Sequence, residues 1–136
     1  MGKVKKLLLG IAVGVAAMPS FAFAGSKQIT VPRGKASAVL ALGVFGAGTC
    51  ESYPVKDVRI ASGPAHGATQ IFTVATKLGK EAGVCAGMAY KAPVVVYRPA
   101  GSFTGVDHLT VNWMTPSHTD NVRMVPNTME IEITVK

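Results

Sequence analysis

The stretch that decides the fold runs Tyr97-Arg98-Pro99-Ala100-Gly101-Ser102-Phe103-Thr104-Gly105-Val106-Asp107-His108-Leu109-Thr110-Val111-Asn112-Trp113. It predicts a strand, a turn and a second strand. The residues Val94–Tyr97 are β-branched or aromatic, which favours a packed, pleated surface. Pro99 has no N–H to donate to a ladder, and the glycines that follow suit a turn. The second strand alternates polar residues with the apolar residues Leu109, Val111 and Trp113.

Two residues of this stretch are predicted to hold the turn in place. Phe103 is apolar within a loop of small residues, so we expect it to cover the edge of the core. Asp107 opens the second strand, and its carboxylate can accept backbone N–H groups of the turn. Tyr97 and Trp113 are expected to fill the core, as large aromatic residues do in β-sandwiches.

The same stretch resembles a signature of bacterial immunoglobulin-like and cadherin-like domains, Y-x-P-x-x-x-F-x-G-x-D, which lies near the end of those modules. Upstream, Gly63-Pro64-Ala65-His66-Gly67-Ala68 resembles their P-x-H-G-T turn, and Met129–Val135 resembles their last strand. The resemblance covers Val58 to Val135, with residues 76–89 divergent. It implies a fold and leaves the function open. The turn positions that it implies are Pro64, His66, Gly67, Tyr97, Pro99, Phe103, Gly105 and Asp107.

The first 24 residues are predicted to be a cleaved signal peptide. A short basic region precedes the apolar run Leu7–Ala17, and Ala22-Phe23-Ala24 forms an A-x-A cleavage site before Gly25. The alternative is a membrane anchor, but the run is shorter than the ~20 residues of a spanning helix. The predicted protein is therefore exported, to the periplasm or the cell exterior, with no membrane span in the mature chain.

Residues 25–136 are expected to form one small domain of 112 residues. Three of the 14 basic residues precede the cleavage site, so 11 remain against 7 acidic residues, a net charge of +4. The basic residues are dispersed, aromatic residues are few and the protein is exported, so no nucleic-acid partner is expected.

The two cysteines, Cys50 and Cys85, are predicted to form a disulfide, because an even pair in an exported protein usually does. A redox pair or metal ligands are the alternatives. They are disfavoured because the chain lacks Cys-x-x-Cys spacing.

Strands are predicted along the rest of the chain by short apolar and alternating segments. Lys35–Phe45 is expected to bury its even-numbered residues, with a helix as the competing prediction because alanine and leucine favour helices. A hairpin is expected to pair Val55–Ser62 with Ala68–Ala75 across a tight turn at Gly63–Gly67. The other predicted strands are Lys27–Val31 and Thr128–Lys136.

Two segments show no clear pattern. Thr76–Met88 is expected to be a surface loop stapled by the disulfide, with a short helix as the alternative. Met114–Pro126 is polar and is expected to be irregular. About seven short strands then predict an all-β fold, an immunoglobulin-like β-sandwich with Greek-key connections.

Catalytic and metal-binding residues are not predicted. Glu130 and Glu132 share a strand face, but nothing indicates that they are buried or polarised as an acid–base pair. The acidic residues are too scattered for a calcium site. Histidine and methionine could together bind a metal, but their spacing does not suggest a converging set. The residues considered are His66, His108, His118, Met88, Met114, Met124 and Met129.

Two functions follow as hypotheses. The first is a non-catalytic structural or interaction module of the cell envelope, without a cofactor, that binds an unknown protein or polymer as a monomer or weak homodimer. It would act through an edge strand or through the segments Thr76–Met88 and Met114–Asn127. The alternative is a small periplasmic carrier of a metal or ligand, which uses the histidines and methionines.

Overall fold

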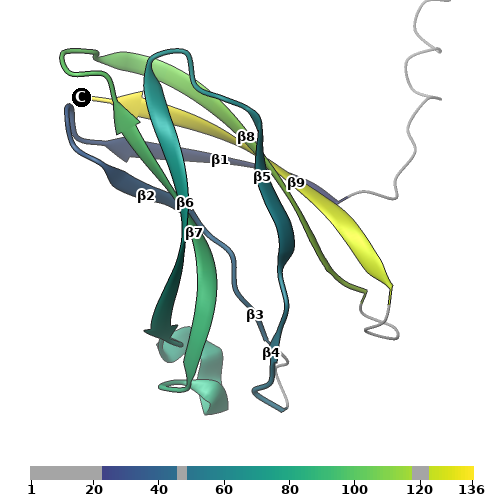
Figure 1. Cartoon of the computed structure of the whole chain (residues 1–136). Helices are drawn as coiled ribbons and strands as arrows, with labels where there is room; N and C mark the ends of the chain where they lie inside the picture. The colour runs from purple at the N-terminus through teal and green to yellow at the C-terminus, as the bar shows by residue number, and fades with distance from the viewer. Residues whose placement is uncertain (1–22, 46–48, 118–122) are drawn as a thin grey trace, which may run out of the picture.

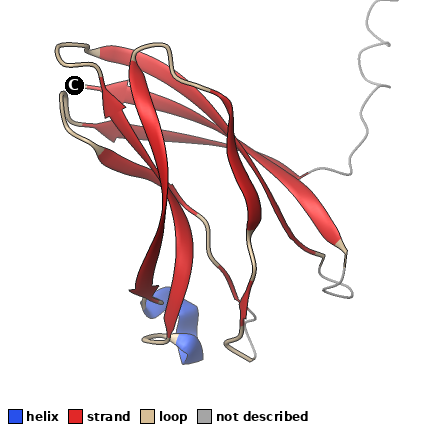
Figure 2. Cartoon of the chain, viewed as in Figure 1, coloured by secondary structure: helices blue, strands red, loops and turns tan. Residues whose placement is uncertain are grey.

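The chain forms two main β-sheets that pack around one core, as the strands in Figure 2 show. The computed structural model describes residues 23–45, 49–117 and 123–136, so most of the predicted signal peptide lies outside the described residues. These residues contain one 3₁₀ helix, η1 (Lys80–Cys85). The strands are β1 (Phe23–Val31), β2 (Ser37–Ala41), β3 (Val44–Phe45), β4 (Ser52–Tyr53), β5 (Lys56–Ser62), β6 (Gly67–Lys77), β7 (Ala89–Pro99), β8 (Gly105–Pro116) and β9 (Met124–Val135).

The larger sheet has four strands in the order β1-β9-β8-β5, and the second has three in the order β2-β7-β6. Strands β3 and β4 form a separate short antiparallel pair. Strand β1 runs parallel to β9, and all other neighbouring strands are antiparallel. The all-β fold is therefore confirmed. The chain crosses between the two main sheets after β1, again between β2 and β5, then after β5 and after β7.

The core lies between the two sheets and is formed by the side chains that the alternating strands direct inward. The alternation predicted for the last strand is confirmed, because Ile131, Ile133 and Val135 are buried. Tyr97 is fully buried, whereas Trp113 is half-buried and packs against the rim of the core. The buried cluster comprises Val31, Val39, Leu40, Leu42, Val95, Tyr97, Leu109, Val111, Ile131, Ile133 and Val135.

The sheets approach each other at the end where the C terminus lies and diverge toward η1 and the β3–β4 pair (Figure 1). Burial follows the same gradient. Along β6, the residues Gly67 and Thr69 are half-buried, but every residue from Gln70 to Lys77 is exposed. We call the two ends of the sandwich the closed end and the open end.

The predicted hairpin between Val55–Ser62 and Ala68–Ala75 is wrong. Strand β5 pairs with β8 in the larger sheet, while β6 pairs with β7 in the other one. The turn between them is present, but it carries the chain from one sheet to the other. Hydrogen bonds from this turn to Asp107 hold it against the closed end instead of allowing it to close a hairpin.

The predicted inward face of Lys35–Phe45 is correct at Leu40 and Leu42, which are buried, and wrong at Ala36 and Ala38, which are exposed. The strand character is confirmed over Ser37–Ala41. The pairing of β2 with β7 shifts register between Ala38 and Leu40, which is a bulge. Val39 and Leu40 are both buried as a result, while Ala38 is exposed. The Lys27 ammonium donates to the Val39 carbonyl at 2.9 Å, so the irregular point of this edge is covered by β1.

The two segments without a pattern are more ordered than predicted. Residues 76–88 contain the end of β6 and the helix η1, so the short-helix alternative is the correct one. Residues 114–126 are not irregular throughout, because β8 extends to Pro116 and β9 begins at Met124. The Asn127 amide is buried and donates to Thr115 across these strands at 3.0 Å.

Candidate functional site

The closed end is organised around the carboxylate of Asp107, which is 2% exposed. One carboxylate oxygen accepts the N–H of Ala65 at 2.8 Å and of His108 at 3.0 Å. The other accepts the N–H of His66 at 3.0 Å and the hydroxyl of Tyr97 at 2.7 Å. Both oxygens thus have two donors, which is how a buried charge is accommodated without an ion pair.

These contacts shift the pKa of both side chains. Burial acts to raise the pKa of the Asp107 carboxyl, but the hydroxyl of Tyr97 and the three backbone N–H groups outweigh it and hold the pKa below its ordinary value of 3.8. Burial, together with the hydrogen bond to the Asp107 carboxylate and its charge, raises the pKa of Tyr97. Asp107 is therefore charged and Tyr97 neutral at neutral pH.

The turn residues implied by the resemblance lie around the same carboxylate. The ring of His66 stacks on Phe103 at 4.2 Å between centroids, and the His66 carbonyl accepts the N–H of Ala100 at 2.8 Å. A Cβ at Gly67 would lie 2.6 Å from the Arg98 carbonyl oxygen, so only glycine fits there.

The rest of the turn motif continues this arrangement. Pro99 pairs with Gly67 at the end of β7, and Pro64 is half-buried. Gly105 has φ 131°, a conformation that favours glycine, where it begins β8 beside the Phe103 ring. This cluster ties a crossover turn to two strands, and every acceptor position of Asp107 is occupied by the protein itself. Its geometry favours a structural role.

At the open end, the predicted disulfide between Cys50 and Cys85 is confirmed, with 5.4 Å between the Cα atoms. It links the segment before β4 to the end of η1. Cys85 is fully buried, although the helix around it is largely exposed.

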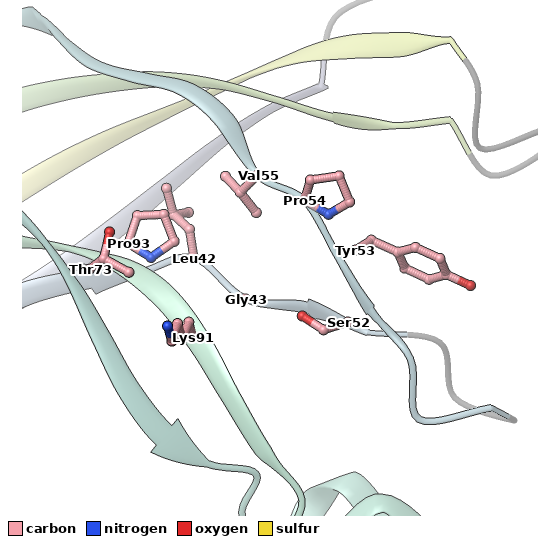
Figure 3. A pocket seen from close by; sticks show the side chains of 9 residues that line it. All are labelled: Leu42, Gly43, Ser52, Tyr53, Pro54, Val55, Thr73, Lys91 and Pro93. Carbon is pink, nitrogen blue, oxygen red and sulfur yellow. The ribbon is translucent and has the colours of Figure 1, made fainter.

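A cleft of about 380 Å³ lies at this end between β4, β6 and β7 (Figure 3). Its apolar part is formed by Leu42, Val55 and Pro93, whereas the polar side chains at its margin are exposed, Lys91 among them. The volume is within the range of small-molecule sites. Most of the lining faces solvent, so the cleft would enclose only part of a ligand. It is lined by Leu42, Gly43, Ser52, Tyr53, Pro54, Val55, Thr73, Lys91 and Pro93.

The free edge of β6 is the other accessible feature of the open end. This strand is the last in its sheet, and within the described residues no other strand pairs with its outer side. Three of its apolar side chains are exposed: Ile71 by 38%, Phe72 by 48% and Val74 by 40%. This edge was not predicted from the sequence, because the segment was expected to form a hairpin with Val55–Ser62. The signal was present, since residues 67–76 contain no charge and no proline.

The histidines considered for metal binding do not join a cluster of ligand side chains in the part of the chain that the structure describes. Within residues 23–45, 49–117 and 123–136, no three histidine, cysteine or acidic side chains are grouped to hold an ion. His66 lies against Phe103, His108 is exposed on β8, and His118 lies outside the described residues. Glu132 pairs across the strands with His108, and Glu130 with Thr110. No helix in these residues has the length and apolarity needed to cross a membrane.

Comparisons with known proteins add little to this description. No family model matches the sequence, and no curated protein matches it. The chain is similar to the solution structure of Amebosin, with a TM-score of 0.42 and 14% sequence identity over 84% of this chain and 98% of that one. At that identity and TM-score, the similarity carries no argument about function.

Proposed function

We propose that the protein is an exported, non-catalytic interaction module with an immunoglobulin-like, Greek-key sandwich. The observation that carries this proposal is the free edge of β6, where backbone that no described strand pairs with occurs together with exposed apolar side chains. Strand edges of this kind bind other chains by adding a strand.

The strand order supports the immunoglobulin-like part of the proposal. A four-stranded sheet β1-β9-β8-β5 opposite a three-stranded sheet β2-β7-β6 has the 4 + 3 division of such sandwiches. The position of the Asp107 cluster at the crossover turn agrees with the resemblance of the two turn motifs. The disulfide agrees with an oxidising compartment and hence with export.

The described histidines give less support to the alternative function as a metal or ligand carrier. His66 is engaged by an aromatic ring and by the turn, and the two described histidines do not join a third ligand. Binding through the β6 edge needs no such ligand set.

Native mass spectrometry of the protein, purified from its own compartment without reducing agent, tests the proposal. We expect a chain that begins at Gly25, contains one disulfide and retains no metal. The same sample after reduction serves as the mass reference, heavier by two hydrogens. A metal ion or small molecule retained at one equivalent would refute the interaction module and favour the carrier.

A further inference from the structure

The edges of the two main sheets differ in how well they are protected against pairing. Strand β5 has three charged residues, Lys56, Asp57 and Arg59, and two register shifts. Strand β2 has a bulge covered by Lys27 of β1. Charges and bulges of this kind prevent edge-to-edge association. Strand β1, the other edge of the larger sheet, also has an unbroken register with β9, but it carries the charged Lys27 within the strand. Strand β6 has an unbroken register with β7 over 11 residues, and its single charge is the terminal Lys77.

The hydrogen bonds around β6 show which of its residues direct their backbone N–H and C=O groups toward β7 and which direct them toward the open edge. The Pro93 carbonyl accepts the N–H of Leu42 on the β2 side, so Pro93 and its partner Thr73 do not bond each other. At both ends of β6, it is the even-numbered residues His66 and Leu78 that bond the β7 side. The odd-numbered residues 67–77 therefore direct their N–H and C=O groups to the open edge.

We propose that two copies of this chain pair along β6, antiparallel, with Phe72 opposite Phe72. This inference rests on the proposed function and names the partner as a second copy. A two-fold axis perpendicular to the sheet keeps each face of the sheet on the same side. Because residues directly opposite each other point to the same face, the axis lies between the two strands, midway between one residue and its own copy. With the axis at Phe72, the odd-numbered Ile71 and Thr73 of opposite copies exchange backbone hydrogen bonds.

The side chains fit this register. Phe72 meets its own copy in a non-hydrogen-bonded pair, where side chains approach most closely and aromatic pairs stabilise. On the same face Gln70 lies opposite Val74. The half-exposed apolar surface of Phe72 and Val74 is thereby covered.

The charges favour the same antiparallel arrangement. Lys77 lies opposite Gly67 of the other copy, which has no side chain. The two copies of Lys77 are separated by ten residues of strand, about 34 Å, which is beyond the range of screened repulsion. A parallel pairing in register would place the two lysines side by side.

Sedimentation of the exported, disulfide-bonded protein over a concentration series tests the proposal. We expect a monomer–dimer equilibrium. The variant Phe72→Lys places two ammonium groups opposite each other and should raise the dimer dissociation constant at least about tenfold. The matched control is Val106→Lys, the same kind of change at a side chain that is 49% exposed on β8, and it should change the constant less than about twofold.

A second variant keeps the test independent of Phe72. Thr73→Pro removes an N–H that faces the open edge and breaks no bond to β7, so it should abolish the dimer while circular dichroism shows a folded chain. In the proposed register, Phe72→Cys should cross-link to its own copy under oxidation. Gln70→Cys should not, because the two residues would lie about 14 Å apart along the strand.

Two results would overturn the proposal. One is a monomer at all concentrations, which would leave the β6 edge for a foreign strand and the proposed function intact. The other is a dimer that survives both Phe72→Lys and Thr73→Pro, because its interface would lie elsewhere. Retention of a metal or small ligand in native mass spectrometry is a separate result, which opposes the proposed function.

Discussion

Replacing Asp107 with asparagine tests how the closed end is held together. Asparagine has nearly the same shape, but it offers one acceptor oxygen where the carboxylate offers two. The four donors are the N–H groups of Ala65, His66 and His108 and the hydroxyl of Tyr97. The substitution therefore changes hydrogen bonding and charge while leaving the packing of the turn in place.

The magnitude follows from the geometry of the four bonds. If the amide oxygen keeps Ala65 and His108, the amide NH₂ group faces Tyr97 and the N–H of His66. The hydroxyl can rotate and accept, but the N–H of His66 loses its acceptor. An unpaired buried donor costs about 1–3 kcal/mol, toward the lower end here because His66 is partly accessible. The two retained hydrogen bonds now end on a neutral oxygen instead of a charged one, which lowers the stability by about 1 kcal/mol for each bond. We expect a total loss of about 3 kcal/mol, a large part of the ~5–15 kcal/mol typical of a domain.

Urea unfolding at neutral pH, with the disulfide intact, measures this loss. Tyr97→Phe is the control, since it removes one donor and leaves the carboxylate with three; we expect it to cost less, about 1–2 kcal/mol. The double variant should lose less than the sum of the two, because both residues act in one network. A loss below about 1 kcal/mol for Asp107→Asn would refute the account of Asp107 as the residue that holds the turn.

The pH dependence gives a second readout of the same residue. Because the pKa of the Asp107 carboxyl is held below its ordinary value of 3.8, its contribution is present above that value and is lost as the pH falls through the lower folded pKa. The unfolding free energy of the parent protein should therefore fall in acid below about pH 4, and Asp107→Asn should reduce that fall. If the unfolding free energy of the variant fell as much in acid as that of the parent protein, Asp107 would not be the group responsible for this pH dependence.

Three further predictions concern the turn, the hydroxyl and the disulfide. Gly67→Ala should destabilise the protein by about 2 kcal/mol or more in urea unfolding, because its Cβ would meet backbone and the Tyr97 ring, whereas the control Gly63→Ala has nothing within 4 Å and should change little. Because burial raises the pKa of Tyr97 from its ordinary value of 10.0, the free energy of unfolding should fall as the pH rises above 10. Tyr97→Phe should make this fall smaller, and an equal fall in both proteins would contradict the role of the Tyr97 hydroxyl. Removing the disulfide by Cys50→Ala with Cys85→Ala should cost roughly 3–4 kcal/mol for a loop of 35 residues, measured against the oxidised parent; no loss would contradict the chain-entropy argument.

The parts of the fold that depend on local pattern could be predicted from the sequence. The alternation in residues 107–113 and 129–135 specified two strands and their buried faces, and Leu109 and Ile133 lie where the alternation puts them. The disulfide followed from the number of cysteines and the expected compartment. The strands were indicated by a pattern within a few neighbouring residues, and the disulfide was indicated by the number of cysteines.

Pairing between distant strands could not be predicted in the same way. The turn at Gly63–Gly67 has the composition of a hairpin turn, and nothing in it indicates that Asp107, about forty residues later, binds its backbone. The bulge near Val39 could not be predicted either, because the register shift depends on the pairing with β7. A shift of one residue reverses which side chains of a strand are buried. The sequence motif correctly suggested that Asp107 accepts backbone N–H groups of a turn, but that turn belongs to another part of the chain.

The same limit applies to the candidate binding edge. A run of residues without charge, such as 67–76, fits a strand paired on both sides as well as an edge strand. Only the sheet order shows that β6 is outermost, and only the register with β7 shows which backbone groups face outward. The cleft beside it joins residues from β4, β6 and β7, so no local pattern could have revealed it.

The closed and open ends of the sandwich are stabilised in different ways, and this division explains why β6 can remain exposed. At the closed end, the Asp107 network and the buried strands hold both sheets together. At the open end the sheets diverge, and Cys85 is one of the few fully buried residues there. The disulfide to Cys50 fixes η1 and the start of β7 where little apolar burial is available, since a cross-link limits the unfolded chain and needs no core. With β7 held at both ends, β6 keeps its register along 11 residues although no strand of the described residues pairs with its outer side. A straight, regular edge is what strand addition requires, so the stabilisation of the two ends and the proposed pairing are parts of one arrangement.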